Sequence, residues 1–167
     1  YPDGSGEFHA SVPGSRNAAN NPTRQTGIVI TELMVEPPSG HRDGEYIELY
    51  NNGGASIALD AWRLDSGASY SFPAGTSLAS GEYLVIAADA GLLRSFHGAI
   101  NVLGNFQGKL SNDGDQLRLL DEKGNLVDEV DYQTGGDWPE LAAGRGSSLE
   151  LLHPDMDNRL SSAWAAS

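Results

Sequence analysis

The stretch GEYIELYNNGGASIALDAWRL, residues 44–64, decides the fold of this chain. Residues 45–50 alternate in polarity, so an extended segment would carry its apolar side chains on one face. The Asn-Asn-Gly-Gly cluster at 51–54 predicts a turn that reverses the chain. A second short run follows and contains Trp62, which we expect to anchor the core. The stretch therefore predicts a hairpin-like unit at the centre of a β-sandwich.

Short runs of this kind recur between turns along the rest of the chain. Residues 28–35 form a β-branched run that stops before Pro37, because proline cannot donate to a strand ladder. Residues 116–121 and 126–132 alternate on either side of a Glu-Lys-Gly-Asn turn and should pair as a hairpin. This spacing of strands and turns is typical of an all-β, antiparallel β-sandwich, with a β-barrel as the alternative.

Helix is nearly absent from the pattern. One short helix is expected over residues 90–97, with Asp89 as its N-cap. Leu92, Leu93 and Phe96 would share one face of that helix.

Composition divides the chain into an arm and a domain. Residues 1–27 are rich in Gly, Pro, Ser and Asn and lack apolar periodicity, which predicts a linker or the end of a preceding module. Residues 28–167 are long enough to form one domain with its own core.

The absence of cysteine excludes disulfides and thiolate metal sites. No apolar run approaches the roughly 18 residues that a membrane span needs.

The charge balance bears on partners. Ten Lys and Arg residues face 23 Asp and Glu residues, which gives a formal net charge of -13. Nucleic-acid binding depends on a basic surface that releases counterions, so nucleic acid is not an expected partner. A divalent cation is a better candidate, because such ions take carboxylate and carbonyl oxygens. The alternative is that the acidic charge only keeps the protein in solution.

No residue pattern predicts a catalytic site. The four histidines lack zinc spacing, and a nucleophile elbow, a P-loop and a dinucleotide fingerprint are missing from the sequence. Glu32 and Glu48 interrupt apolar strands, so they are either the acid and base of a hydrolase or carboxylates held by structural partners. The second interpretation is favoured, and the arginines proposed as partners are Arg63, Arg118 and Arg145.

Two acidic turns are calcium candidates. The first contains Asp113 and Asp115, and the second contains Asp155 and Asp157. Oxygen-rich turns can supply the ligands that calcium takes, but neither turn matches the EF-hand loop. The alternative is an Asx-turn in each, where the side chain bonds the nearby backbone. Calcium is the only cofactor for which the sequence offers candidates.

The ordered set of these segments resembles the lamin tail domain family, in its bacterial form. The matching segments are IVITELM (28–34), EYIELYNNGG (45–54), IALDAWRLD (57–65), FPAGTSLASGEYLVIA (72–87), KLSNDGDQLRLLDEKGNLVDEVDY (109–132) and GRGSSLEL (144–151). The resemblance implies an immunoglobulin-like antiparallel β-sandwich over most of the chain. The coiled-coil rod of nuclear lamins is missing, and the acidic surface does not suit chromatin.

The resemblance and the missing catalytic pattern together predict a non-catalytic interaction or scaffolding module. It would belong to a larger, multidomain protein that is secreted or displayed at the cell surface, with a protein or another cell-surface component as partner. One alternative is an accessory domain of a multidomain hydrolase or nuclease. Another is a calcium- or glycan-binding adhesion module, in which Tyr46, Tyr50 and Tyr70 line a sugar platform.

Overall fold

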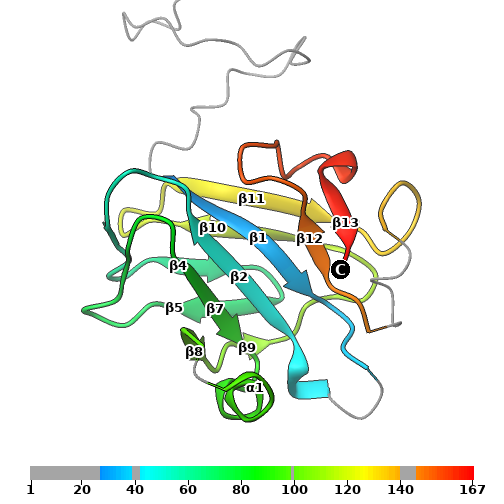
Figure 1. The fold of residues 1–167 in the computed structure, drawn as a ribbon, viewed down its shortest axis with the longest axis horizontal. Coiled ribbons are helices and arrows are strands. Elements are labelled where there is room, and N and C mark those ends of the chain that lie inside the picture. Colours follow the sequence, from blue (N-terminus) through cyan, green and yellow to red (C-terminus); the bar gives the residue numbers. More distant parts are fainter. Residues whose placement is uncertain (1–26, 39–41, 99, 140–145) are drawn as a thin grey trace, which may run out of the picture.

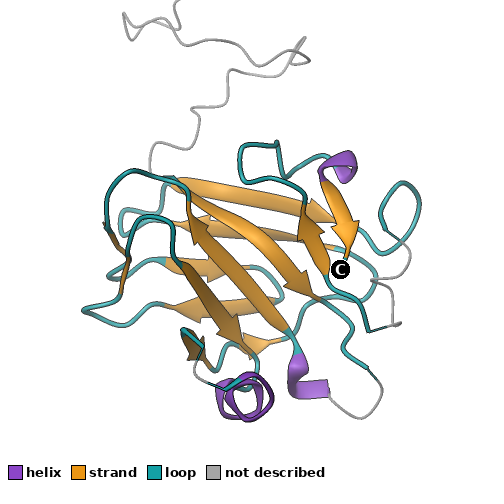
Figure 2. Ribbon diagram, viewed as in Figure 1, coloured by secondary structure: helices purple, strands orange, loops and turns teal. Residues whose placement is uncertain are grey.

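The computed structural model describes residues 27–38, 42–98, 100–139 and 146–167. Strands dominate this part of the chain, and helical segments are short (Figure 2). The strands are β1 (Ile28–Met34), β2 (Tyr46–Asn51), β3 (Ile57–Ala58), β4 (Arg63–Asp65), β5 (Ala68–Ser71), β6 (Ser77–Leu78), β7 (Tyr83–Ala87), β8 (Val102–Gly104), β9 (Gln107–Gly108), β10 (Asp115–Leu120), β11 (Leu126–Tyr132), β12 (Leu149–Leu151) and β13 (Trp164–Ala166). The helical segments are η1 (Arg42–Gly44), α1 (Ala90–His97) and η3 (Ser161–Ala163).

Two sheets pack face to face, which confirms the predicted β-sandwich. The six-stranded sheet has the order β13-β12-β1-β2-β7-β8, and the five-stranded sheet has the order β11-β10-β4-β5-β9. In Figure 1 the six-stranded sheet lies in front of the five-stranded one, so its outer face is turned toward the reader. Neighbouring strands are antiparallel except for β7 and β8, which run parallel. The predicted antiparallel pairing is therefore correct for every described pair but that one.

The core fills the space between the two sheets. Ile47 and Leu49 enter it from β2, and Leu117 and Leu119 enter it from β10, all without exposed surface. Trp62 is 4% exposed and belongs to the same cluster, as predicted. Alternation along β2 therefore sends every second residue inward and leaves the others for the outer face.

The predicted hairpin between residues 45–50 and 57–64 is wrong. β2 bonds to β1 on one side and to β7 on the other, so neither of its edges is open to the next segment. β4 instead lies in the opposite sheet, between β10 and β5. The turn after β2 carries the chain from one sheet to the other.

Asn51 organises that turn from a fully buried position. Its Nδ2 donates to the carbonyl oxygens of Ala55 at 2.9 Å and Leu78 at 2.8 Å. Its Oδ1 accepts the N–H of Gly53 at 2.9 Å. A buried amide with all these groups bonded has no desolvation penalty left uncompensated, so it stabilises the crossover.

The hairpin of β10 and β11 is confirmed, with pairs that run from Asp115–Tyr132 to Leu120–Leu126. Its turn is held by one carboxylate: Asp121 accepts the backbone N–H of Lys123 at 2.9 Å and of Asn125 at 2.8 Å. These are the bonds of an Asx-turn, which the local sequence can specify by itself.

The predicted helix is present as α1. Asp89 Oδ1 accepts the N–H of Leu92 at 2.9 Å, which confirms the N-cap. Leu93 is buried with Val102 of β8, so α1 covers the β7–β8 end of the outer face. Phe96 is 59% exposed, so the expected apolar face of the helix is buried only in part.

The C-terminal segment completes the six-stranded sheet, because β12 pairs with β1 and β13 pairs with β12. Trp164 is buried, and its Nε1 donates to the carbonyl oxygen of Asn158 at 2.8 Å. Its ring centroid lies 6.1 Å from that of Trp138.

The arm predicted at 1–27 lies, except for Gly27, outside the described residues. Among the residues that the structure describes, none forms a helix long and apolar enough to cross a membrane.

Candidate functional site

Three glutamates form a row across the outer face of the six-stranded sheet. Glu32 of β1 lies directly opposite Glu48 of β2 on one side and opposite Glu150 of β12 on the other. Val85 of β7 continues the row beyond Glu48, and Ala165 of β13 ends it beyond Glu150. Like charges at directly opposite positions destabilise a sheet, so this glutamate row is not what strand pairing alone would select.

In the part of the chain that the structure describes, hydroxyl groups and not arginines bind Glu32 and Glu48. Tyr46 donates its hydroxyl to Glu32 Oε1 at 2.6 Å, and the Ser148 hydroxyl donates to the same oxygen. The Thr31 hydroxyl donates to Glu48 Oε1 at 2.8 Å. Thr31 reaches the outer face because the register of β1 shifts between Ile30 and Glu32. The structural interpretation of the two strand glutamates therefore fits the contacts.

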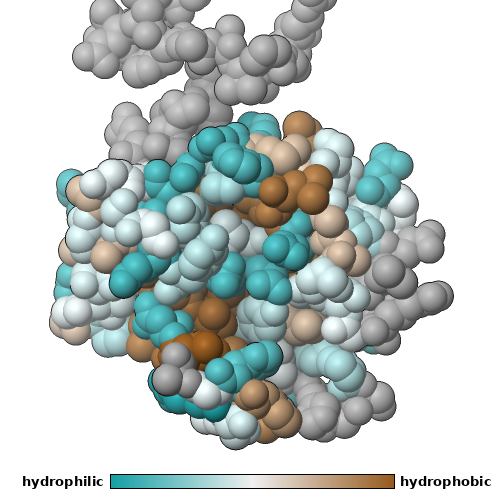
Figure 3. Space-filling view, viewed as in Figure 1, coloured by the Kyte–Doolittle hydropathy of each residue, from teal (hydrophilic) through white to brown (hydrophobic). Residues whose placement is uncertain are grey.

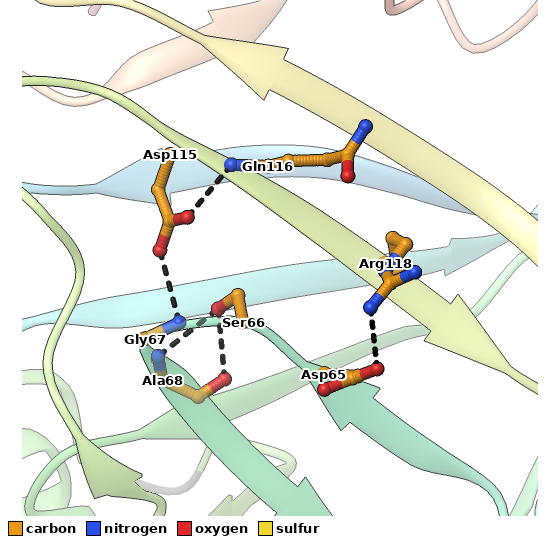
Figure 4. Close-up of polar contacts among 7 residues, drawn as sticks. All are labelled: Asp65, Ser66, Gly67, Ala68, Asp115, Gln116 and Arg118. Atoms are coloured by element: carbon orange, nitrogen blue, oxygen red, sulfur yellow. Dashed lines mark hydrogen bonds and ion pairs between the residues drawn. The ribbon is translucent and has the colours of Figure 1, made fainter.

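Two of the three arginines predicted as partners of Glu32 and Glu48 lie in the other sheet. Arg63 belongs to β4 and Arg118 to β10, both in the opposite sheet. Arg118 instead pairs with Asp65 at 2.7 Å, as Figure 4 shows. Arg145 lies outside the described residues.

Burial and repulsion both disfavour the charge on Glu48. Burial raises the pKa of its carboxyl from 4.5 to about 7, and the charges of Glu32 and Glu150 add to the rise. The bond from Thr31 opposes it. The pKa of Tyr46 is also raised, first by burial and then by its bond to Glu32, so its hydroxyl keeps its proton and stays a donor.

Tyrosines lie beside the row. Tyr50 of β2 and Tyr83 of β7 are directly opposite each other, with ring centroids 4.5 Å apart and planes tilted by 33°. Tyr83 is 51% exposed, so the pair offers aromatic surface to solvent. Figure 3 shows the same face: hydrophilic residues cross its middle between hydrophobic patches above and below.

The three tyrosines proposed as a sugar platform do not come together. Tyr46 and Tyr50 share the outer face of the six-stranded sheet, but Tyr70 belongs to β5 in the other sheet. Tyr70 packs there against Phe72, with ring centroids 5.2 Å apart. The aromatic neighbour of Tyr50 is Tyr83, which the sequence analysis did not single out.

In the first calcium candidate turn, the carboxylate of Asp115 accepts hydrogen bonds from backbone N–H groups. Asp115 accepts the N–H of Gly67 at 2.9 Å with one oxygen and the N–H of Gln116 at 2.8 Å with the other (Figure 4). Asp113 is exposed, and its backbone N–H donates to the Ser111 hydroxyl at 3.2 Å. Asp115 thus ties the start of β10 to the turn between β4 and β5.

The second candidate turn has different contacts. Asp155 Oδ1 accepts from Asn52 Nδ2 at 2.7 Å, which ties this loop to the turn after β2. Asp157 forms two bonds of 2.9 Å with the guanidinium of Arg159. No group of three or more His, Asp or Glu residues suited to a metal ion occurs in the described ranges. Calcium binding at either turn stays a prediction.

Sequence reasoning missed Glu150, Ser148 and Tyr83. The alternation of residues 147–152 predicts a strand with Glu150 on the face opposite Leu149 and Leu151, as β12 has it. Alternation does not say which strand lies beside which, so the glutamate row could not be read from it.

A model of the Lamin Tail Domain family matches residues 21–134, which is more than half of the 167-residue chain. No curated protein matches the chain. The matched range contains Glu32, Glu48 and all three outer-face tyrosines, whereas Glu150 lies beyond it. The family is immunoglobulin-like, and the described residues form such a sandwich. The chain therefore belongs to the Lamin Tail Domain family.

Proposed function

We propose that this chain is a non-catalytic interaction module of a larger secreted or cell-surface protein, and that it binds through the outer face of its six-stranded sheet. The observation that carries this proposal is the glutamate row with its tyrosines. Strand pairing gains nothing from three carboxylates in direct opposition, and such departures from local stability tend to mark functional sites.

The surroundings of the row favour binding over catalysis. Glu32 accepts two hydroxyls on one oxygen, and Glu48 accepts a third, so hydrogen bonds fix both side chains on a sheet face. Aromatic surface lies beside them, and tyrosine is enriched at interfaces because its ring is apolar and its hydroxyl polar. A secreted or surface setting is proposed because this module would then meet partners through an exposed acidic face.

The test is site-specific photo-cross-linking in the full-length parent protein. A photoreactive residue replaces Tyr83 on the proposed face, and in a separate protein it replaces Gln116, which is exposed on β10 of the other sheet. We expect irradiation to link position 83 to one recurrent peptide of a partner and to leave position 116 without one.

Two results would contradict the proposal. Equal cross-linking at both positions would show that the face has no special role. Turnover of a hydrolase substrate by the purified chain, abolished by Glu32→Gln or Glu48→Gln, would make the row an active site.

A further inference from the structure

The glutamate row has no cationic partner among the described residues. The ion pairs in this part of the chain join Arg118 to Asp65, Lys123 to Glu122, Arg159 to Asp157 and His153 to Asp155. None of them includes a glutamate of the row, and the donors to Glu32 and Glu48 are neutral hydroxyls. A cation from outside the domain would therefore relieve a repulsion that the described part of the fold leaves in place.

The dimensions of the row fit side chains better than a single ion. Neighbouring strands lie about 4.8 Å apart, so three carboxylates on adjacent strands span roughly 10 Å. Alternate residues of an extended peptide lie about 6.6 Å apart, so two basic side chains on one face of it can reach the row together. One metal ion would need its ligands within about 2.6 Å of a common point.

The rest of the face suits the stems and heads of basic side chains. Val85 lies next to Glu48 in the row and offers apolar surface to an aliphatic stem. The Tyr50–Tyr83 pair lies beside it, with Tyr83 half exposed. A guanidinium over an exposed tyrosine ring gains about 0.5–1 kcal/mol from the cation–π interaction.

We propose that the partner segment on this face is cationic: an extended stretch of a protein that places Arg or Lys side chains at alternate positions over Glu150, Glu32 and Glu48, beside Tyr83. This inference rests on the proposed function and names the chemistry of its partner. The formal charge of -13 on the chain also favours encounter with a basic segment, because opposite fields steer association.

The experiment is isothermal titration calorimetry at low salt, in which a capped Gly-Arg-Gly-Arg-Gly peptide is added to the 167-residue chain. The control peptide carries citrulline in place of arginine, which removes the charge and keeps the shape. We expect binding of the arginine peptide only.

Matched triple variants separate the face from the general acidity of the chain. The face variant carries Glu32→Gln, Glu48→Gln and Glu150→Gln. The control variant carries Glu122→Gln, Asp131→Asn and Asp137→Asn, three exposed carboxylates away from the row. Each variant replaces three carboxyl groups with neutral amides. The face variant should bind the arginine peptide about tenfold more weakly, and the control variant should change affinity less than about twofold.

A single substitution keeps the inference testable if the triple variant does not fold. Tyr83→Ala removes a half-exposed ring and should weaken binding about two- to fivefold, with an unchanged near-ultraviolet spectrum. Unchanged affinity in the face variant would overturn the inference. Equal losses in the face and control variants would overturn it as well, because they would show a general charge effect.

These results are separable from those of the cross-linking experiment. A recurrent cross-link at position 83 to a segment without Arg or Lys overturns the cationic partner and leaves the proposed function standing. Row-dependent peptide binding without any cross-link at position 83 in the parent protein supports the cationic chemistry and overturns the proposed function.

Discussion

Asn158 and Asp128 meet in the interior although they come from the C-terminal loop and from β11. Asn158 Nδ2 donates to Asp128 Oδ2 at 2.7 Å, and the same oxygen accepts the backbone N–H of Ile30 at 2.7 Å. Both side chains are buried. Since β1 lies in one sheet and β11 in the other, this carboxylate joins the two layers of the sandwich where the register of β1 shifts.

We expect Asp128→Ala to lower the free energy of unfolding by about 2–4 kcal/mol, because it leaves the N–H of Ile30 and the amide of Asn158 buried without this partner. Urea denaturation measures the change. The control is Asp131→Ala, which removes an exposed carboxylate on the same strand. Its free energy of unfolding should stay within about 0.5 kcal/mol of the unsubstituted chain. Equal effects of the two variants would contradict a linking role for Asp128.

Glu48→Gln should stabilise the domain at about pH 8, and the gain should shrink as the pH falls toward 5. The pKa of Glu48 is raised to about 7 in the folded state, so between 4.5 and 7 the native chain holds more protons than the unfolded chain. Stability from this group is therefore present at low pH and is lost as the pH rises through 7. The groups that act on it are Glu32, Glu150 and Thr31.

The expected gain at about pH 8 is about 1–2 kcal/mol, less than the full shift implies because water still reaches this carboxylate. Melting temperatures of both proteins across the pH range provide the measurement. A constant difference between them from pH 5 to 8 would show that Glu48 titrates as an ordinary glutamate.

Tyr46 and Ser148 should act as a unit, because both hydroxyls donate to the same oxygen of Glu32. Tyr46→Phe and Ser148→Ala should each lower the free energy of unfolding by about 1 kcal/mol. The double variant should depart from the sum by about 0.5 kcal/mol or more. Strict additivity in urea denaturation would show that the two donors do not share the carboxylate. Tyr83→Phe, from the exposed tyrosine, is the control.

Local signals in the sequence were enough for some elements. The β10–β11 hairpin was predictable because Asp121 bonds backbone groups two and four residues on, within its own turn. The start of α1 was predictable for the same reason, since Asp89 bonds Leu92. The lamin tail resemblance was confirmed by the family match, and it supplied what local signals did not, namely the packing of the sheets.

Pairings between distant segments were not predictable. β4 comes after β2 and the short β3 in the chain but joins the other sheet, because β1 and β7 already occupy both edges of β2. The glutamate row depends on the same non-local register, since Glu150 meets Glu32 only once β12 has docked beside β1. Alternation excludes a one-residue slip, because that would turn the core side chains outward. A two-residue slip would keep every side chain on its face and still separate the glutamates, and no local residue pattern excludes it.

The calcium prediction is tested by melting the chain in saturating calcium and in EDTA. An occupied site raises the melting temperature, because calcium about a hundredfold above its Kd adds about 2.7 kcal/mol. The rise should vanish in Asp113→Asn/Asp115→Asn if the first turn binds, or in Asp155→Asn/Asp157→Asn if the second does. The difference between the two conditions is the readout, since Asp115 also holds Gly67 without metal. Equal melting temperatures in both conditions would exclude both turns.

Trp164→Ala tests whether the segment beyond the family match belongs to the folding unit. The match ends at residue 134, yet β12 pairs with β1, and Trp164 of β13 is buried against Trp138. Truncating a buried tryptophan lowers the free energy of unfolding by about 3–5 kcal/mol. Trp164→Phe keeps a ring but loses the bond to Asn158, so about 1–2 kcal/mol should be lost. Urea denaturation should give the highest stability for the unsubstituted chain, a lower one for the phenylalanine variant and the lowest for the alanine variant. If the alanine variant unfolds at the same urea concentration as the unsubstituted chain, β12 and β13 are not part of the cooperative folding unit. Glu150 would then join the row from outside that unit.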